Sequence, residues 1–153
     1  MSVAFRRESD DEHLEPRFEL PIPPGPNLVT PRGRELIMAK VAELEAAVAA
    51  ANDDAREALL RELRYWRTRQ ATATLAPPPA PGEVGIGSRV AFRLNGQDRE
   101  LAIVGMDEAD PPTGLIGFQA PLARALIGAG VGERIDFGGK VEAIEVVAVA
   151  PVG

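Results

Sequence analysis

The period of the apolar positions changes along the chain, and each change predicts a different kind of element. In the first half, apolar side chains recur at alternating steps of four and three residues, which is the seam of a helical coiled coil. In the second half the period is two, which is typical of half-buried strands. Two proline-rich stretches separate these patterns from their surroundings. The sequence thus predicts an extended or disordered arm (1–27), an antiparallel coiled-coil hairpin (28–74), a proline-rich linker (75–85) and a sheet domain (86–150).

The helical region carries start signals for two helices. Thr30 is a good N-cap, and Pro31 suits the first helical position, where its missing N–H has no partner to lose. Since neither amphipathic helix can bury its apolar stripe alone, and the turn at Ala51–Ala55 is short, we expect an antiparallel hairpin. The predicted seam is Ile37, Val41, Leu44, Val48 and Ala51, followed by Leu59, Leu63, Trp66, Gln70 and Ala73. Residues Arg61, Glu62, Arg64, Arg67 and Arg69 are expected on a solvated face.

The second half predicts an α+β domain. Two alternating segments, "SRVAFRL" and "RELAIVG", flank Asn95-Gly96, a strong signal for a type I′ hairpin turn. "GLIGF" predicts another strand, and "PLARALIGA" a short helix that begins near Pro121. A closing hairpin is expected around the Gly138-Gly139 turn. This order favours an antiparallel sheet with one helix packed on a face.

Composition narrows the chemistry. A net charge of −6 argues against unaided binding to duplex nucleic acid, because phosphate binding depends on Lys and Arg, so contact with nucleic acid is expected only within a larger complex. The chain has no cysteine and a single histidine, His13, so thiolate and zinc sites are not expected. No apolar run of about 20 residues or secretory leader is recognisable, which favours a cytoplasmic protein that does not cross a membrane.

One segment resembles a known family. "IVGMDEADPPTGLIGFQAPLARALIGAGVGERIDF", Ile103–Phe137, resembles the C-terminal domain of the GreA/GreB transcript cleavage factors, in which I-V-G, D-E-A-D, L-I-S, S-P-L-A-R-A-L-L-G-K and V-G-D follow in this order. "NLVTPRGRELI", Asn27–Ile37, is similar to the I-T-P-E-G that precedes the first coiled-coil helix of the family. The resemblance spans Asn27 to about Val149 and implies a coiled-coil hairpin followed by an FKBP-like domain.

The resemblance also implies a partner, RNA polymerase. In the family, the globular domain docks on the rim of the secondary channel of the polymerase, and the coiled coil inserts toward the active centre. The corresponding docking residues here are Asp107, Glu108, Gln119, Pro121 and Leu122. Ala120 stands where the family commonly has serine before the proline. The alternative for this cluster is a surface turn, with the leucines in the core.

The acids at the predicted hairpin tip have two interpretations. Family cleavage factors carry G-D-x-x-E-N-x-x-Y there, and its two carboxylates help to hold a second catalytic Mg²⁺ inside the polymerase. Asp54 and Glu57 keep the D-x-x-E spacing, and carboxylate oxygens suit Mg²⁺. However, Asp53 and Ala58 replace the family's glycine and asparagine, the later tyrosine is missing, and the hairpin is shorter. An aspartate followed three residues later by glutamate is equally a variant of the capping box.

The resemblance therefore implies a polymerase-binding regulator of transcription elongation. We expect a monomer, but the sequence leaves the oligomeric state open, because the alanines of the seam leave room for a second hairpin. Such a regulator has no cofactor of its own, and at most it shares Mg²⁺ with the polymerase, whose active site performs any hydrolysis, so the chain is not a free-standing enzyme. The alternatives are an Rnk-like regulator without cleavage activity, a coiled-coil interaction module unrelated to polymerase, and an FKBP-like prolyl isomerase. An isomerase pocket needs clustered aromatic side chains, and after Trp66 only Phe92, Phe118 and Phe137 remain. Whether the protein stimulates cleavage is left open by the sequence.

Overall fold

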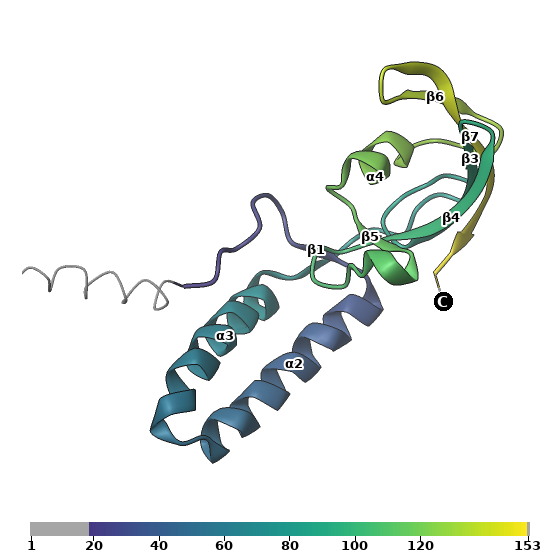
Figure 1. Cartoon of the computed structure of the whole chain (residues 1–153). Helices are drawn as coiled ribbons and strands as arrows, with labels where there is room; N and C mark the ends of the chain where they lie inside the picture. Colours follow the sequence, from purple (N-terminus) through teal and green to yellow (C-terminus); the bar gives the residue numbers. More distant parts are fainter. Residues whose placement is uncertain (1–18, 153) are drawn as a thin grey trace, which may run out of the picture. The chain divides into compact units, whose positions relative to one another are not determined.

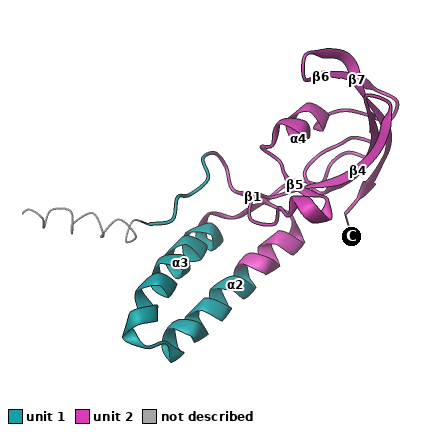
Figure 2. Cartoon of the chain, viewed as in Figure 1, with its two compact units in different colours: residues 1–24, 38–71 teal, residues 25–37, 72–153 magenta. Residues whose placement is uncertain are grey.

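A computed structural model describes residues 19–152, which divide into two compact units (Figure 2). Within the described residues, unit 1 contains the chain up to Pro24 and Met38–Ala71. Unit 2 contains Gly25–Ile37 and the chain from Thr72 onward. The expectations for most of the arm, including His13, lie outside the described residues.

Two helices of 20 residues each, α2 (Pro31–Ala50) and α3 (Asp53–Thr72), form the predicted hairpin (Figure 1). The first turns of α2 and the last residue of α3, Thr72, belong to unit 2, and the rest of the two helices belongs to unit 1. In unit 1 the central seam is confirmed, because its apolar residues pack into one cluster. This cluster contains Val41, Leu44 and Leu63, with Val48, Leu59 and Trp66 packed against it.

The end of the predicted seam is wrong. Gln70 is exposed, whereas Arg69, expected on the solvated face, is only 2% exposed. A straight helix repeats every 3.6 residues, so a seam read at a fixed period of 3.5 drifts away from the buried face over several turns. The long aliphatic stem of arginine also covers apolar surface well, which makes its burial less costly than its charge suggests.

Unit 2 contains a five-stranded sheet of order β5-β4-β3-β7-β6, with the short helix α4 (Pro121–Leu126) inside its curve (Figure 1). The strands are β3 (Ser88–Leu94), β4 (Gln97–Val104), β5 (Leu115–Gly117), β6 (Arg134–Phe137) and β7 (Lys140–Pro151). The expectation of a wholly antiparallel sheet is wrong, because β4 and β5 pair in parallel. The chain between these strands contains a 3₁₀ turn at Pro111–Thr113 and leads back along β4, so that Leu115 pairs with Ala102 and Gly117 with Val104. Strand β5 therefore runs in the same direction as β4.

Both hairpin turns of the sheet follow the glycine signals. Asn95 and Gly96 alone connect β3 to β4, and both have positive φ, 52° and 84°. This is the conformation that a type I′ turn requires, so the predicted turn is confirmed. Gly138 and Gly139 connect β6 to β7 in the same way, with φ of 63° and 80°.

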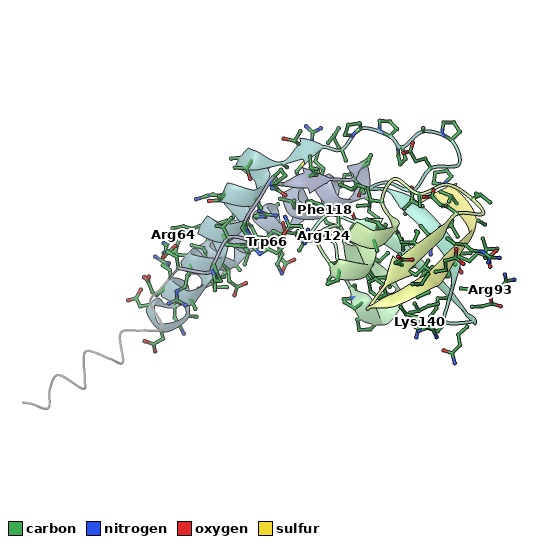
Figure 3. The ribbon with its side chains drawn as sticks, turned by 90° about the horizontal axis from the view of Figure 1, so that it is seen from above. Arg64, Trp66, Arg93, Phe118, Arg124 and Lys140 are labelled. Carbon is green, nitrogen blue, oxygen red and sulfur yellow. The ribbon has the colours of Figure 1, made fainter. Side chains whose placement is uncertain are left out.

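The core of unit 2 lies between the sheet and α4. Its buried members are Val84, Val90, Phe92, Leu101, Ile103, Phe118, Ala123, Leu126, Ala129, Ile144 and Val146. Phe118, a member of this core, is labelled in Figure 3. Phe92 and Phe118 are thus committed to the core, and Phe137 packs against it. Side-chain packing, rather than an aromatic-lined site, accounts for the position of these three rings.

A second, two-stranded sheet was not predicted. Strand β1 (Leu28–Val29) pairs in parallel with β2 (Thr74–Leu75), so the chain entering α2 lies beside the chain leaving α3. The backbone N–H of Thr74 donates to the carbonyl of Asn27, and that of Ala76 to Val29, each at 2.9 Å. Asn27, from the end of the predicted arm, and Leu75 and Ala76, from the start of the predicted linker, therefore take part in this backbone pairing within unit 2. Among the described residues, no helix is both long and apolar enough to cross a bilayer.

Candidate polymerase-docking loop and hairpin tip

The segment between β4 and α4 contains three of the five residues predicted to dock, Asp107, Glu108 and Gln119, and the other two begin α4. This segment packs tightly against the start of the helical hairpin. A Cβ added to Gly105 would lie 2.7 Å from the carbonyl oxygen of Leu28. A Cβ added to Gly33, in the first turn of α2, would lie 2.8 Å from a carboxylate oxygen of Glu108. Side chains larger than hydrogen do not fit at either position without displacing their neighbours. The two glycines therefore allow the loop and the base of α2 to meet within unit 2.

Glu108, one of the residues predicted to dock, is buried. Its side chain is only 1% exposed, and its carboxylate accepts a hydrogen bond from the hydroxyl of Thr30 at 2.5 Å and from the guanidinium of Arg32 at 2.8 Å. The Thr30 hydroxyl oxygen in turn accepts the backbone N–H of Gly33 at 3.0 Å, as an N-cap does. Burying a charge is costly unless it is paired and hydrogen-bonded, and these contacts satisfy that need. Glu108 thus joins the loop to the N-terminus of α2 and presents no carboxylate to a partner.

The other predicted docking residues differ in accessibility. Pro121 is exposed and begins α4, as predicted. Asp107 and Gln119 are half-buried, and the side-chain amide of Gln119 lies 2.8 Å from the position of a Cβ added to Gly25. Leu122 is half-buried and packs against the core. The accessible part of the predicted surface therefore centres on Pro121, with partial contributions from its neighbours.

The tip of the hairpin lies in unit 1, and its cap differs from the expected one. The side-chain oxygen of Asn52 accepts the backbone N–H of Ala55 at 2.9 Å, so Asn52 is the N-cap of α3. Asp53 and Asp54 occupy the first turn instead, where negative charge is favourable to the helix dipole. The capping-box interpretation of Asp54 is wrong, because the cap position is already taken by Asn52.

Asp53, Asp54 and Glu57 are all exposed. Asp54 and Glu57 are three positions apart in α3 and therefore lie on the same side of the helix. A carboxylate oxygen of Glu57 is 3.9 Å from the guanidinium of Arg64, which is a loose ion pair at the surface. Neither acid is buried or committed to the cap.

The fit of these two acids to Mg²⁺ is partial. Mg²⁺ prefers six oxygen ligands, and protein sites commonly supply one or two carboxylates while water and substrate supply the rest. Within the described part of the chain, no group of three or more His, Cys, Asp or Glu side chains could hold a metal ion. Asp54 and Glu57 therefore fit a metal only as a minor part of a ligand set that another molecule completes.

Sequence reasoning missed the residues that organise both regions. Asn52 lies outside the D-x-x-E spacing of Asp54 and Glu57, although asparagine directly before an acidic first turn is a common helix start. The partners of Glu108 were missed because D-E-A-D resembles an exposed polar turn. A signal was present in Gly33: glycine inside a helix costs about 1 kcal/mol relative to alanine, so its presence in the first turn indicates close approach of another group.

Comparison with known proteins assigns the globular domain. Residues 78–151 match the family model described as "Transcription elongation factor, GreA/GreB, C-term". The matched residues include the whole five-stranded sheet and α4. The chain contains a GreA/GreB C-terminal domain. The resemblance first noted at Ile103–Phe137 is thereby confirmed.

Individual relatives agree with this family. The GreA of Mesoplasma florum is 46% identical over 57 residues, covering 36% of this chain and 36% of that protein. The GreA of Mycoplasma capricolum subsp. capricolum is 35% identical over 82 residues, or 52% of each chain. The chain therefore matches about half the length of these curated relatives, or less. A GreA/GreB factor structure from Nitrosomonas europaea aligns with 83% of this chain and 99% of its own at 22% identity, with a TM-score of 0.41.

Proposed function

We propose that this protein is a regulator of transcription elongation that binds RNA polymerase at its secondary channel through the GreA/GreB-type domain. The observation that carries the proposal is the family match over residues 78–151, which includes the loop between β4 and α4. The relatives that match at 46% and 35% identity are named as transcription elongation factors. In this proposal the chain is a binding protein, and any RNA hydrolysis takes place in the active site of the polymerase.

Side-chain exposure supports a narrower set of contact residues for this proposal. Pro121 is exposed at the start of α4, and half-buried Asp107 and Gln119 leave part of their surface accessible. The buried carboxylate of Glu108 holds the loop in place through its hydrogen bond from Thr30. We therefore assign direct contact to the surface around Pro121 and a supporting role to Glu108.

A binding assay tests this assignment. Pro121→Glu places a charge at the centre of the proposed contact, and it should weaken association with the cognate core polymerase at least tenfold in a pull-down or fluorescence titration. Val141→Glu is the matched control, because Val141 is 74% exposed on β7 and its replacement also adds one negative charge. Equal affinity of the two variants would contradict docking at Pro121, and no association of the unmodified protein would contradict the polymerase assignment.

The tip supports a further part of the proposal, in which Asp54 and Glu57 contribute ligands to Mg²⁺ shared with the polymerase. Both carboxylates are exposed on one side of α3, and Asn52, rather than Asp54, caps the helix. The competing candidate is an Rnk-like regulator that binds polymerase without stimulating cleavage, which is favoured by Asp53 and Ala58 in place of the family's glycine and asparagine.

Cleavage of RNA in stalled, backtracked elongation complexes separates these two functions. If the acids assist cleavage, the unmodified protein shortens the transcript, whereas Asp54→Ala/Glu57→Ala binds equally well and does not. If both proteins bind and neither shortens the transcript, the Rnk-like function holds. The double variant of Glu43 and Glu45 to alanine controls for the loss of two charges, since both residues are exposed on α2.

A further inference from the structure

The segment before the helical hairpin contacts the second helix through a specific ion pair. The carboxylate of Glu19 accepts two hydrogen bonds from the guanidinium of Arg64, from Nε at 2.7 Å and from the Nη2 nitrogen at 2.8 Å. The two residues are 45 positions apart in the sequence, and both belong to unit 1. Arg64 lies on the exposed side of α3, and its label marks this place in Figure 3. A guanidinium bound to two oxygens of one acid is the geometry by which arginine recognises carboxylate and phosphate groups.

The contact extends beyond this ion pair into a shallow groove. Leu20 and Ile22 line it from the segment, and Tyr65 and Thr68 line it from α3. Leu20 and Ile22 remain 39% and 44% exposed, so the segment lies on the surface of the helix and is not part of the core. Apolar contacts of this size orient the segment but leave it easy to displace.

Further guanidinium groups flank the site. Arg61 precedes Arg64 by one helical turn, and Arg67 follows it by one turn, so the three lie along one side of α3. Arg67 also donates to Glu45 at 2.9 Å, while the buried Nε of Arg61 has no hydrogen-bond partner among the described residues. We call these three side chains the arginine row.

The arginines around Glu19 favour the charged form of its carboxyl group. The hydrogen bonds from Arg64 hold the pKa of Glu19 below its usual range, and the charge of Arg61 acts in the same direction. In the sequence, five more acids precede Glu19 between positions 8 and 15, namely Glu8, Asp10, Asp11, Glu12 and Glu15. The segment is thus the end of an acidic stretch, opposite in sign to the arginine row.

We propose that the segment from Glu19 to Ile22 is an intramolecular cover for the arginine row, in which Glu19 occupies the place of an external oxyanion group, carboxylate or phosphate. An anionic partner binds the row only when the segment leaves. An exposed ion pair contributes little, so the cover opens readily and reduces external binding by a factor of about 3 to 5. The cover therefore tunes the affinity of α3 for anions and does not abolish it. This inference is independent of the proposed binding to polymerase.

The position of the segment is testable directly, because the chain contains no cysteine. A spin label attached to Pro21→Cys, next to the groove, should broaden the amide signals of Tyr65 and Thr68 in the full chain. Arg64→Ala should remove most of this broadening, and the exchanged pair Glu19→Arg/Arg64→Glu should restore it. Broadening that is unchanged by Arg64→Ala would overturn the ion pair as the contact that holds the segment.

The covering role is tested with two anions used separately, a short inorganic polyphosphate and a penta-glutamate peptide. Glu19→Gln should bind at least one of them about 3 to 5 times more tightly than the unmodified chain at low salt, and the probe that gains identifies the preferred oxyanion. Adding Arg64→Ala should cancel the gain. Glu43→Gln is the matched control, since it removes one exposed carboxylate from α2. An equal gain with Glu43→Gln, or no gain with either probe, would overturn the proposal.

Discussion

Replacement of Glu108 by alanine should destabilise unit 2 by about 2 to 4 kcal/mol, although the residue lies in a loop that resembles a polar surface turn. The reason is its burial: the side chain is 1% exposed and its carboxylate holds both Thr30 and Arg32. A surface residue of the same type would change the free energy of unfolding by no more than about 0.5 kcal/mol. The size of the effect therefore separates an internal linking role from a docking role.

The magnitude follows from the separate contacts. A hydrogen bond from Thr30 to a charged acceptor is worth about 1.5 to 3 kcal/mol, and its loss leaves the hydroxyl without its acceptor. Arg32 contributes less, at most about 1 kcal/mol, because its side chain is 59% exposed and solvent screens the pair. Removal of a buried charge also recovers part of its desolvation cost, which brings the total below the sum. Glu108→Gln keeps an acceptor for Thr30 and should cost only about 1 kcal/mol.

Urea denaturation followed by circular dichroism measures these differences, and amide hydrogen exchange locates them. The backbone N–H of Gly33 should exchange faster in Glu108→Ala, because it donates to the Thr30 hydroxyl that Glu108 positions. Glu100→Ala provides the control, since Glu100 is exposed on β4 of the same unit. If Glu108→Ala unfolds at the same urea concentration as the control and Gly33 is equally protected, the linking role is refuted.

Three further predictions concern unit 1. Leu63→Ala should lower the free energy of unfolding by about 2 to 5 kcal/mol, measured by urea denaturation, because Leu63 is 2% exposed at the centre of the seam. Asn52→Ala should cost about 1 kcal/mol by the same measurement, and Asn52→Asp should cost much less because it still caps α3. The contact between Glu19 and Arg64 should persist at neutral pH and be lost as the pH falls through the lowered pKa of Glu19, because protonation removes the charge that Arg64 and Arg61 favour; chemical-shift titration of the Glu19 carboxyl measures this.

Features that depend on local sequence were predictable. Thr30 and Pro31 determine the start of α2, and Asn95-Gly96 determines the first hairpin, because capping and positive φ are properties of a few adjacent residues. The apolar period likewise indicates which face of each helix is buried. The parallel pairing of β4 with β5 and of β1 with β2 has no such local signal, since it depends on how distant segments meet. Strands of two or three residues are also too short to show a period.

In the candidate site, too, the local sequence predicts some features, and contacts between distant segments determine the others. Family resemblance indicates which segment is important, but it does not distinguish the exposed Pro121 from the buried Glu108 within that segment. That distinction depends on Gly33 and Gly105, whose missing side chains let the base of α2 and the loop approach each other. Gly33 and Gly105 are 72 positions apart in the sequence, so their role in this contact can be recognised only from the structure.

The assignment of the cap to Asn52 also makes the tip acids easier to test. If Asp54 capped α3, its replacement would weaken the helix, and a loss of activity could not be separated from a loss of structure. Because Asn52 accepts the Ala55 N–H, Asp54 stabilises the helix mainly through its dipole, at about 0.3 to 1 kcal/mol, and Glu57, beyond the first turn, contributes only a loose surface ion pair with Arg64. Their joint replacement should therefore leave α3 folded, so that a change in transcript cleavage would report on the carboxylates themselves.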